Sequence, residues 1–149
     1  MDKITLRVKR LENNQDLPLP SYQSDGSSGL DLRAAVAKEL VLKPGDIEFI
    51  PTGLAVSIPI GYEAQIRPRS GLALKYGLGL VNSPGTIDSD YRGEICIIAI
   101  NWGKGPVTIK RGDRIAQMIV SKVSKVIVEE SKGLDDTERG EGGFGHTGV

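Results

Sequence analysis

A chain of 149 residues, 39% of them hydrophobic, has the size of one domain with one core, which argues against a two-domain enzyme with separate cofactor and substrate lobes. Nineteen basic residues balance nineteen acidic ones, so the net charge is zero and the chain lacks the bulk positive potential of proteins that bind DNA or RNA. The single Cys96 and the single histidine argue against an internal disulfide, a conventional structural zinc site, and haem or iron–sulfur chemistry.

The N-terminal residues lack the pattern of a sorting signal. Residues 1–10 have no continuous apolar segment, and nowhere does the sequence offer the roughly 18 unbroken apolar residues of a membrane span. We therefore expect the protein in a reducing, aqueous compartment, the cytoplasm, without a membrane partner.

Turn residues are abundant, with 19 glycines and 8 prolines and no internal repeat, which indicates many short strands and an all-β domain. The first strand is expected where Ile4, Leu6 and Val8 alternate with polar residues. The other strands are expected over residues 47–50, 53–58, 62–67, 94–101, 107–109, 115–122 and 125–129. This spacing is typical of a sandwich or jelly roll.

Helical structure is expected to be scarce. Ser70–Tyr76 predicts one short helix of about two turns, ended by Gly77. Ala34–Leu40 has helix propensity, but the turn at Lys43–Asp46 and the β-branched residues beyond it favour strands on both sides of that turn. Residues 1–130 are predicted to form the β domain, and residues 131–149, which lose apolar periodicity, a flexible glycine-rich arm.

Five segments combine glycine with side chains that bind phosphate, metal or a proton. The first is Ser28–Ala35. If it forms a strand, Asp31 faces away from Leu30 and Leu32, which leaves a carboxylate free for a hydrated cation. The alternative is an ordinary solvated strand aspartate.

The second segment is Arg67–Ala73, in which Pro68 ends a strand and Ser70 or Gly71 begins the short helix. A guanidinium, a hydroxyl and the first N–H groups of a helix would then point the same way and form a phosphate cradle. The alternative is an ordinary helix start with a surface arginine.

The third segment, Asn82–Glu94, places three carboxylates, an aromatic ring and two glycines in an expected hairpin. If this stretch is extended, Asp88 and Asp90 share one face and Tyr91 lies on the other. A hairpin tip with turn-stabilising aspartates is the alternative.

The fourth segment, Lys110–Ile119, is expected to be a turn that leads into a buried strand. Gln117 is polar within an apolar run and therefore needs a hydrogen-bond partner, with a protein group favoured over a ligand. The fifth, Arg139–Gly148, is rich in glycine but lacks the lysine and the following helix of a P-loop, which excludes nucleotide binding by that mechanism. A flexible tail is its alternative.

Taken together and in this order, the five segments resemble the five motifs of the trimeric dUTP diphosphatases, the dUTPases. The resemblance runs from Ser28 to Gly148. It implies a distorted jelly roll (the dUTPase-like β-clip) with one short helix, and a homotrimer whose active sites are shared between subunits and closed by a C-terminal arm. The implied reaction is Mg²⁺-assisted cleavage of dUTP to dUMP and pyrophosphate, which limits uracil incorporation into DNA and supplies dUMP for dTMP synthesis.

The resemblance also assigns roles to residues. Asp88 would activate the attacking water, and Asp31 would hold Mg²⁺ through water. Gln117 would bond to a phosphate oxygen or an ordered water, and Tyr91 would pack under the deoxyribose. Phosphate binding is implied for Arg69, Ser70 and Gly71; reading of the uracil edge for Asn82, Gly85, Thr86 and Ile87; and closure of the site by Arg139 on the γ-phosphate, with Phe144 stacking on uracil beside Gly145.

One position departs from the family pattern. Where the family usually shows Gly-Phe-Gly-Ser-Thr-Gly, this chain has His146 in place of the serine. An imidazole donates more strongly to phosphate when protonated, so closure of the arm is hypothesised to depend on pH between about 6 and 7.

Two other functions are weighed against this one. A dCTP deaminase shares the fold and the trimeric plan but attacks the base, and it would release ammonia from dCTP rather than pyrophosphate from dUTP. A nucleotide-sensing or protein-binding module that has lost catalysis would lack Asp88 or the arm, and this chain keeps both.

Overall fold

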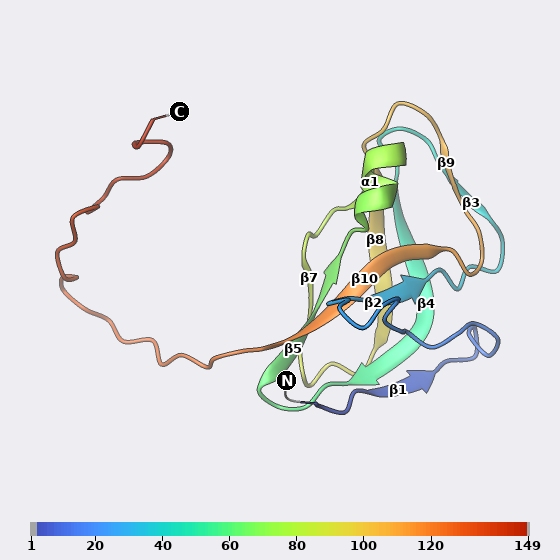
Figure 1. Ribbon diagram of the computed structural model, residues 1–149, viewed down its shortest axis with the longest axis horizontal. Coiled ribbons are helices and arrows are strands. Elements are labelled where there is room, and N and C mark those ends of the chain that lie inside the picture. The colour runs from blue at the N-terminus through green and yellow to red at the C-terminus, as the bar shows by residue number, and fades with distance from the viewer. Residues whose placement is uncertain (1–2, 149) are drawn as a thin grey trace.

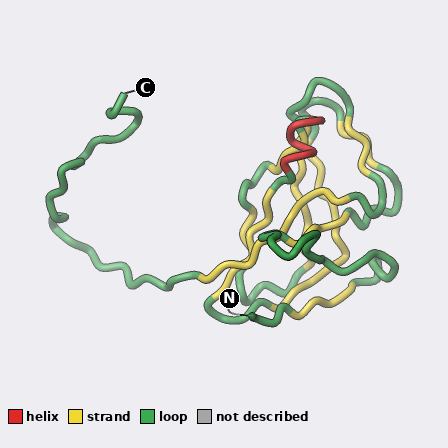
Figure 2. The backbone as a smooth tube through the Cα atoms, in the orientation of Figure 1, coloured by secondary structure: helices red, strands yellow, loops and turns green. Residues whose placement is uncertain are grey.

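The computed structural model describes residues 3–148, in which it contains short strands, one long strand and one helix (Figures 1 and 2). In chain order, the elements are β1 (Arg7–Arg10), β2 (Leu30–Arg33), β3 (Leu40–Leu42), β4 (Ile47–Ser57), β5 (Tyr62–Arg67), α1 (Ser70–Tyr76), β6 (Leu78–Leu80), β7 (Gly85–Ile87), β8 (Glu94–Asn101), β9 (Val107–Ile109) and β10 (Arg114–Lys122). Within the described residues, no helix has the length and apolar character that crossing a membrane requires. The prediction of an all-β fold with one short helix is confirmed.

Two four-stranded antiparallel sheets form the body, with strand orders β1-β4-β8-β6 and β2-β10-β5-β7, and β3 pairs with β9 in a separate ribbon. A single core cluster takes side chains from both sheets, for example Ile95 and Ile97 from the first and Leu32 and Met118 from the second. Strand β8 shows why: its residues alternate between buried and half-buried positions, as a strand with one face on a core must. The sheets are therefore two layers packed on one core.

Helix α1 has the bounds that the sequence predicts, Ser70–Tyr76. Gly77 ends it in the left-handed conformation, with φ 69°, and its N–H donates to the carbonyl of Ala73 at 2.9 Å. A Cβ at Gly77 would also lie 2.5 Å from the backbone nitrogen of Gly103, so glycine is required there for space as well as for conformation. The helix follows β5 directly and so starts at the end of the second sheet.

Three predicted details differ from the structure. The two strands expected over 47–50 and 53–58 are one strand, β4, with an irregularity between Pro51 and Ala55. The first strand starts at Arg7 rather than at Ile4. Residues 125–129 form no strand: after β10 the chain leaves the sheets, and Val126, Ile127 and Val128 are 80–97% exposed. Their β-branched side chains suit a strand, but within the described residues no edge of this domain pairs with them.

The hairpin predicted over Asn82–Glu94 is wrong in its pairing. Strand β7 pairs with β5 in one sheet, whereas β8 pairs with β4 and β6 in the other. The residues between them therefore carry the chain from one layer to the other, and they turn at Asp88, whose carbonyl accepts a hydrogen bond from the N–H of Tyr91 at 3.1 Å. Asp88 and Asp90 consequently do not lie on one face of an extended strand.

Candidate active site

The sheet order β2-β10-β5 brings three of the five sequence segments together. Gln117 on β10 lies opposite Asp31 on β2 and, on its other side, opposite Arg67 on β5. Because α1 begins three residues after Arg67, the start of the helix lies beside the same strand ends. A cavity of about 310 Å³ opens there, and its lining includes Gly29, Asp31, Arg69, Ser70, Gly71 and Gln117.

Gln117 is held over the floor of this cavity. Its Nε2 donates to the carbonyl of Pro68 at 3.0 Å, which confirms the prediction of a protein partner. A Cβ at Gly29 would lie only 2.4 Å from Oε1 of Gln117, so this approach of side chain to backbone requires glycine. The amide is thus fixed in place and faces the cavity.

Asp31 is not free, contrary to the sequence-based prediction. Its Oδ1 lies 3.3 Å from Nε of Arg69, and its Oδ2 lies 3.0 Å from Nη1 of Arg114. The carboxylate does face away from the core residue Leu32, as predicted, but the neighbouring β10 and the residue before α1 each bring an arginine to it. Asp31 is therefore a fixed, ion-paired carboxylate whose side chain is 12% exposed.

Asp88 and Tyr91 lie in a different hollow of about 210 Å³, whose other lining residues are Phe49, Thr86, Ile87, Glu94 and Cys96. Tyr91 is fixed by its hydroxyl, which donates to the carbonyl of Glu94 at 2.9 Å. Asp88 is exposed at the end of β7. The two hollows have no lining residue in common.

The side chains near Asp88 in the sequence contact the protein backbone. Arg92 donates to the carbonyls of Ser89 and Tyr91, at 2.7 and 2.9 Å. A Cβ at Gly85 would lie 3.0 Å from Nδ2 of Asn82, so the Asn82 amide lies against the start of β7. The peptide bond before Pro84 is cis.

Cys96 shares the hollow of Asp88 but is not a nucleophile. Burial, with a smaller contribution from the charge of Glu94, raises the pKa of its thiol to about 11. The thiol therefore stays protonated near neutral pH, where only the thiolate attacks.

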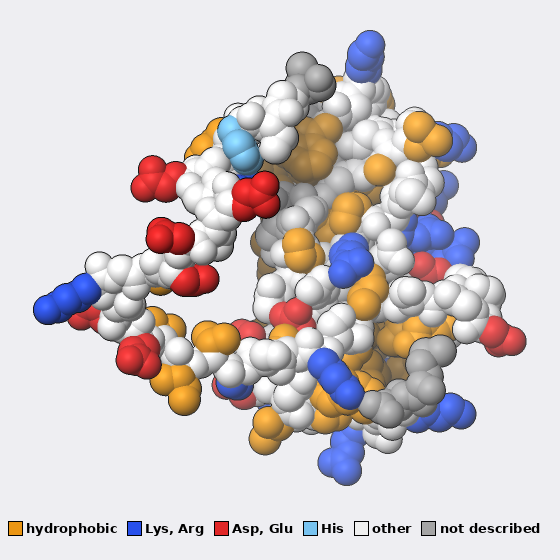
Figure 3. Space-filling view, turned by 60° about the vertical axis from the view of Figure 1, so that its left-hand side comes forward, with side chains coloured by type: hydrophobic (Ala, Val, Ile, Leu, Met, Phe, Trp, Pro, Cys, Tyr) orange, Lys and Arg blue, Asp and Glu red, His pale blue; other side chains and the backbone are white. Residues whose placement is uncertain are grey.

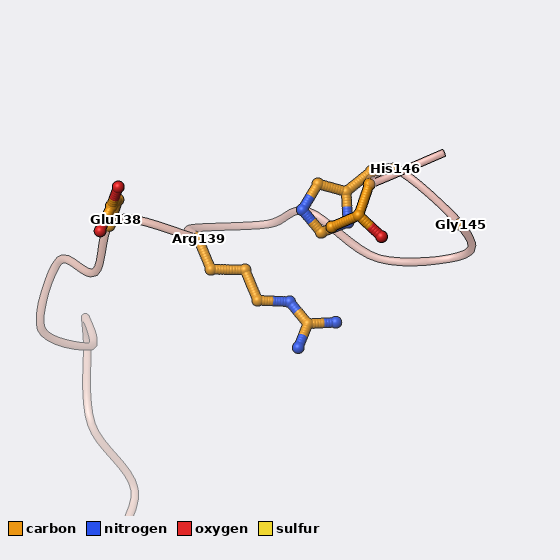
Figure 4. A pocket seen from close by; sticks show the side chains of 5 residues that line it. Glu138, Arg139, Gly145 and His146 are labelled. Atoms are coloured by element: carbon orange, nitrogen blue, oxygen red, sulfur yellow. The ribbon is translucent and has the colours of Figure 1, made fainter. Parts of the chain in front are cut away.

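The C-terminal arm stands away from the body (Figure 1), and Figure 3 shows acidic side chains along it. Arg139, Gly145 and His146 line a hollow made by the arm itself (Figure 4), where Nε of Arg139 donates to the carbonyl of Gly142 at 2.8 Å. Phe144 is fully exposed and has a left-handed φ of 50°. The structure thus brings Arg139, Gly145 and His146 together in the arm, apart from the predicted site residues of the body.

Comparison with known proteins fixes the family. A family model described as dUTPase matches residues 15–148. The chain belongs to the dUTPase family. Its family makes the chain a hydrolase of nucleotide metabolism. Its antiparallel sheets form the fold of that family.

Relatives match this dUTPase over nearly its whole length. The deoxyuridine 5'-triphosphate nucleotidohydrolase of Caldanaerobacter subterraneus subsp. tengcongensis is 58% identical, over 98% of this chain and 99% of the relative. The protein of the same name from Thermoanaerobacter sp. is 55% identical with the same coverage. Among solved structures, the Staphylococcus bacteriophage 80alpha dUTPase with dUPNHPP is similar with a TM-score of 0.88 and 28% identity, over 99% of this chain and 100% of that one.

A further structural relative bears on metal binding. The mutant dUTPase of phage phi11 of S. aureus, described with a structural Mg(II) ion, has a TM-score of 0.77 and 25% identity, over 87% of this chain and 98% of that one. In this dUTPase, residues 3–148 contain no group of three or more His, Cys, Asp or Glu side chains placed to bind a metal. The cavity at α1 offers one carboxylate, Asp31. That set fits Mg²⁺, which keeps several waters and binds through one or two carboxylates together with substrate phosphates.

The sequence reasoning missed Arg114, which binds Asp31 directly. Arg114 lies three positions before Gln117, and on a regular strand that odd spacing would place the two side chains on opposite faces. The pairing of β10 with β2 shifts register between Arg114 and Ala116, and this irregularity returns both side chains to one face. The consecutive apolar residues Ile115 and Ala116, both buried, are the one signal in the sequence that could have indicated it.

Proposed function

We propose that this protein hydrolyses dUTP to dUMP and pyrophosphate as a homotrimer whose active sites are each built from neighbouring subunits. It would thereby limit uracil in DNA and supply dUMP for dTMP synthesis, in the cytoplasm. The observation that carries the proposal is the separation of the two hollows on one chain. Phosphate-binding side chains line one, and the proposed catalytic Asp88 lines the other.

A closed cyclic assembly offers a way to combine the half-sites. In a ring, the surface around α1 of one subunit can face the surface around β7 of the next, and the same contact repeats until the ring closes. The arm, which extends from the body, would reach a site that its own subunit does not complete. Each site would then contain residues of three chains.

An apolar outer face supports contact between subunits. On the sheet β1-β4-β8-β6, Phe49 lies opposite Ile98 and Ile47 lies opposite Ile100 on the side away from the core. Phe49 is 67% exposed and Trp102 is 66% exposed. The Trp102 ring covers Gly79 on the strand β6, which neighbours β8. Exposed apolar faces of this kind mark protein–protein contacts.

The cavity at α1 would bind the triphosphate. Arg69 offers a guanidinium, Ser70 a hydroxyl, and Gln117 an amide that is already fixed. The first N–H groups of α1 have no partner within the helix and would add donors. Asp31 would hold Mg²⁺ through water, and bound Mg²⁺ would neutralise charge on the phosphate oxygens and the leaving pyrophosphate.

Asp88 would orient and deprotonate the water that attacks the α-phosphorus in line with the leaving pyrophosphate. Its exposure in a single chain is what such a role requires, because the water and the phosphate would come to it with the neighbouring subunit. Most of the acceleration would arise from positioning and electrostatics, since phosphoryl transfer needs little covalent chemistry from the protein.

Selection of uracil and deoxyribose is assigned to the segment around β7. Asn82 and the backbone of Gly85, Thr86 and Ile87 would pair with the uracil edge, and a mismatched base would leave buried polar groups unpaired at about 1–3 kcal/mol each. Tyr91, held by Glu94, would pack under the sugar and collide with a ribose 2′-hydroxyl.

The arm would close the site. Arg139 would bind the γ-phosphate, and Phe144, beside Gly145, would stack on uracil, a contact worth about 1–3 kcal/mol in comparable pairs. Closure would expel water and align the triphosphate.

The direct test compares two nucleotides with the purified protein and Mg²⁺. Pyrophosphate released from dUTP, with dUMP in equal amount and no ammonia from dCTP, is the expected result. Ammonia from dCTP would support the deaminase, and binding of dUTP without turnover would support the module that has lost catalysis.

A further inference from the structure

Two arginines hold Asp31, and they bind it differently. Nη1 of Arg114 donates to Oδ2 in a hydrogen bond of 3.0 Å, whereas Nε of Arg69 makes a longer ion pair of 3.3 Å with Oδ1. Arg69 also donates through Nη1 to the backbone carbonyl of Arg114 at 2.9 Å. The three side chains therefore carry one formal positive charge in excess, beside a cavity that we assign to phosphates.

The two arginines also face different spaces. Arg69 lines the cavity that holds Asp31, Ser70 and Gln117, and it also lines a groove between α1 and β9–β10. Arg114 lines the groove, together with Tyr76 and Ile109, but not the cavity. Arg114 thus reaches Asp31 from behind the cavity, where a bound nucleotide would not touch it.

The strand register fixes this arrangement. Arg114 lies opposite Arg33 and Gln117 lies opposite Asp31, so after the irregularity Arg114 is the diagonal neighbour of Asp31 on the same face of the sheet. The backbone of β10 therefore sets the position from which the guanidinium of Arg114 approaches. Arg33, on that same face, is occupied elsewhere, since its Nη1 donates to the carbonyl of Gly112 at 2.8 Å.

We propose that Arg114 is a positioning residue, which keeps the Asp31 carboxylate fixed when Arg69 turns from Asp31 to a substrate phosphate. This inference rests on the proposed function. An entering triphosphate competes with Asp31 for Arg69, and the longer of the two ion pairs yields. Without Arg114, two outcomes are open when the triphosphate enters. If Arg69 turns to the phosphate, the Asp31 carboxylate that holds hydrated Mg²⁺ is left without an arginine to fix it. If Arg69 stays on Asp31, it does not bind the phosphate.

The test uses the variants Arg114→Gln and Arg114→Lys, with Arg33→Gln as the matched control on the same face. For each, kcat, the KM for dUTP and the Mg²⁺ concentration for half-maximal rate are measured. Calorimetry with the non-hydrolysable imido analogue dUpNHpp, with and without Mg²⁺, gives a readout independent of turnover. Thermal unfolding of each variant reports whether it is folded.

We expect Arg114→Gln to lower kcat and raise the half-saturating Mg²⁺ concentration by about 10–100-fold, as the loss of a residue that orients a metal ligand does. At saturating Mg²⁺, KM should rise by less than kcat falls, because Arg114 does not itself touch substrate. The gain in analogue affinity from Mg²⁺ should shrink. Arg114→Lys should recover part of the loss, and Arg33→Gln should resemble the parent.

The proposal is overturned if Arg114→Gln keeps the parent's kcat and Mg²⁺ response, if it raises KM alone, or if Arg33→Gln shows the same losses. If Arg114→Gln does not fold, Arg114→Lys becomes the deciding variant. A half-saturating Mg²⁺ concentration equal to that of the parent in Arg114→Lys then overturns the proposal. Failure of the hydrolase function itself would show separately, as absence of pyrophosphate release by the parent protein.

Discussion

The body and the arm contribute to the proposed site in opposite ways. In the body, Arg69 binds Asp31 and the backbone of β10, and Gln117 donates to the carbonyl of Pro68, before any ligand binds. In the arm, Arg139 bonds to Gly142 three residues away, and Phe144 is fully exposed. Groups that are fixed in advance lose little conformational entropy when the ligand binds. An arm that becomes ordered at closure loses more, and its own contacts with the ligand must offset that loss. Changes in the two regions should therefore differ in what they do to turnover, binding and stability.

The largest effect is expected in the body, from Asp88→Asn. The amide cannot accept the proton of the attacking water, so kcat should fall by at least about 1,000-fold. The variant is nearly isosteric, and calorimetry with dUpNHpp should give an affinity within a few-fold of the parent. Turnover close to that of the parent would remove Asp88 from the mechanism.

Removal of the arm comes next. A chain that ends at Glu138 loses the Arg139 contact and the Phe144 stack, each worth about 1–3 kcal/mol, so kcat/KM should fall by about 100-fold or more. The unfolding temperature should not change, because residues 131–141 and 144–148 of the arm are exposed. A clear fall in unfolding temperature would mean that the arm packs on the folded body, which contradicts the contrast between the two regions.

A single side chain of the arm should have a smaller effect. Phe144→Ala should lower kcat/KM by about tenfold through loss of base stacking. Leu134→Ala is the matched control, since Leu134 is also an exposed apolar side chain of the arm, at 91%. Equal losses in both variants would mean that the arm acts through general apolar contact rather than through Phe144.

The smallest effect is expected from an ion pair of the body outside the site. A hydrogen bond from Arg111, 3.2 Å between Nε and Oδ2, lowers the pKa of Asp16 below its ordinary value of 3.8. Its contribution to stability is therefore present above that value and is lost as pH falls through the lowered pKa. Because Asp16 is exposed, Asp16→Asn should lower the unfolding temperature only slightly at pH 7, and the difference should vanish in acid. A difference that grows in acid would contradict the direction of the shift.

The sequence predicted the body well where local chemistry decides the structure. Pro68 and Gly77 delimit α1, and the apolar, isoleucine-rich run over residues 94–101 predicts the strand β8, although only the structure shows which of its faces is buried. It failed where distant partners decide. Residues 125–129 have a strand pattern but no edge to pair with, and β7 and β8 belong to different sheets although a short turn joins them.

The candidate site shows the same division. Asp31, Arg69 and Gln117 were identified from the sequence and line one cavity, but the ion pairs of Asp31 could not be predicted, because an irregularity in β10 decides which side chains share its face. The roles of Asp88, Tyr91 and the arm depend on neighbouring subunits, and they stay predictions.

Mixing two inactive variants tests the shared site most directly. Arg69→Ala impairs the phosphate cavity and Asp88→Asn impairs the other hollow, and the two chains are refolded together and assayed for pyrophosphate release from dUTP. If each site joins the cavity of one subunit to the hollow of the next, random trimers should recover about a quarter of the parent's activity, because one pairing in four combines two intact halves. A mixture no more active than its separate components would show that a single chain builds the whole site, and would contradict the account.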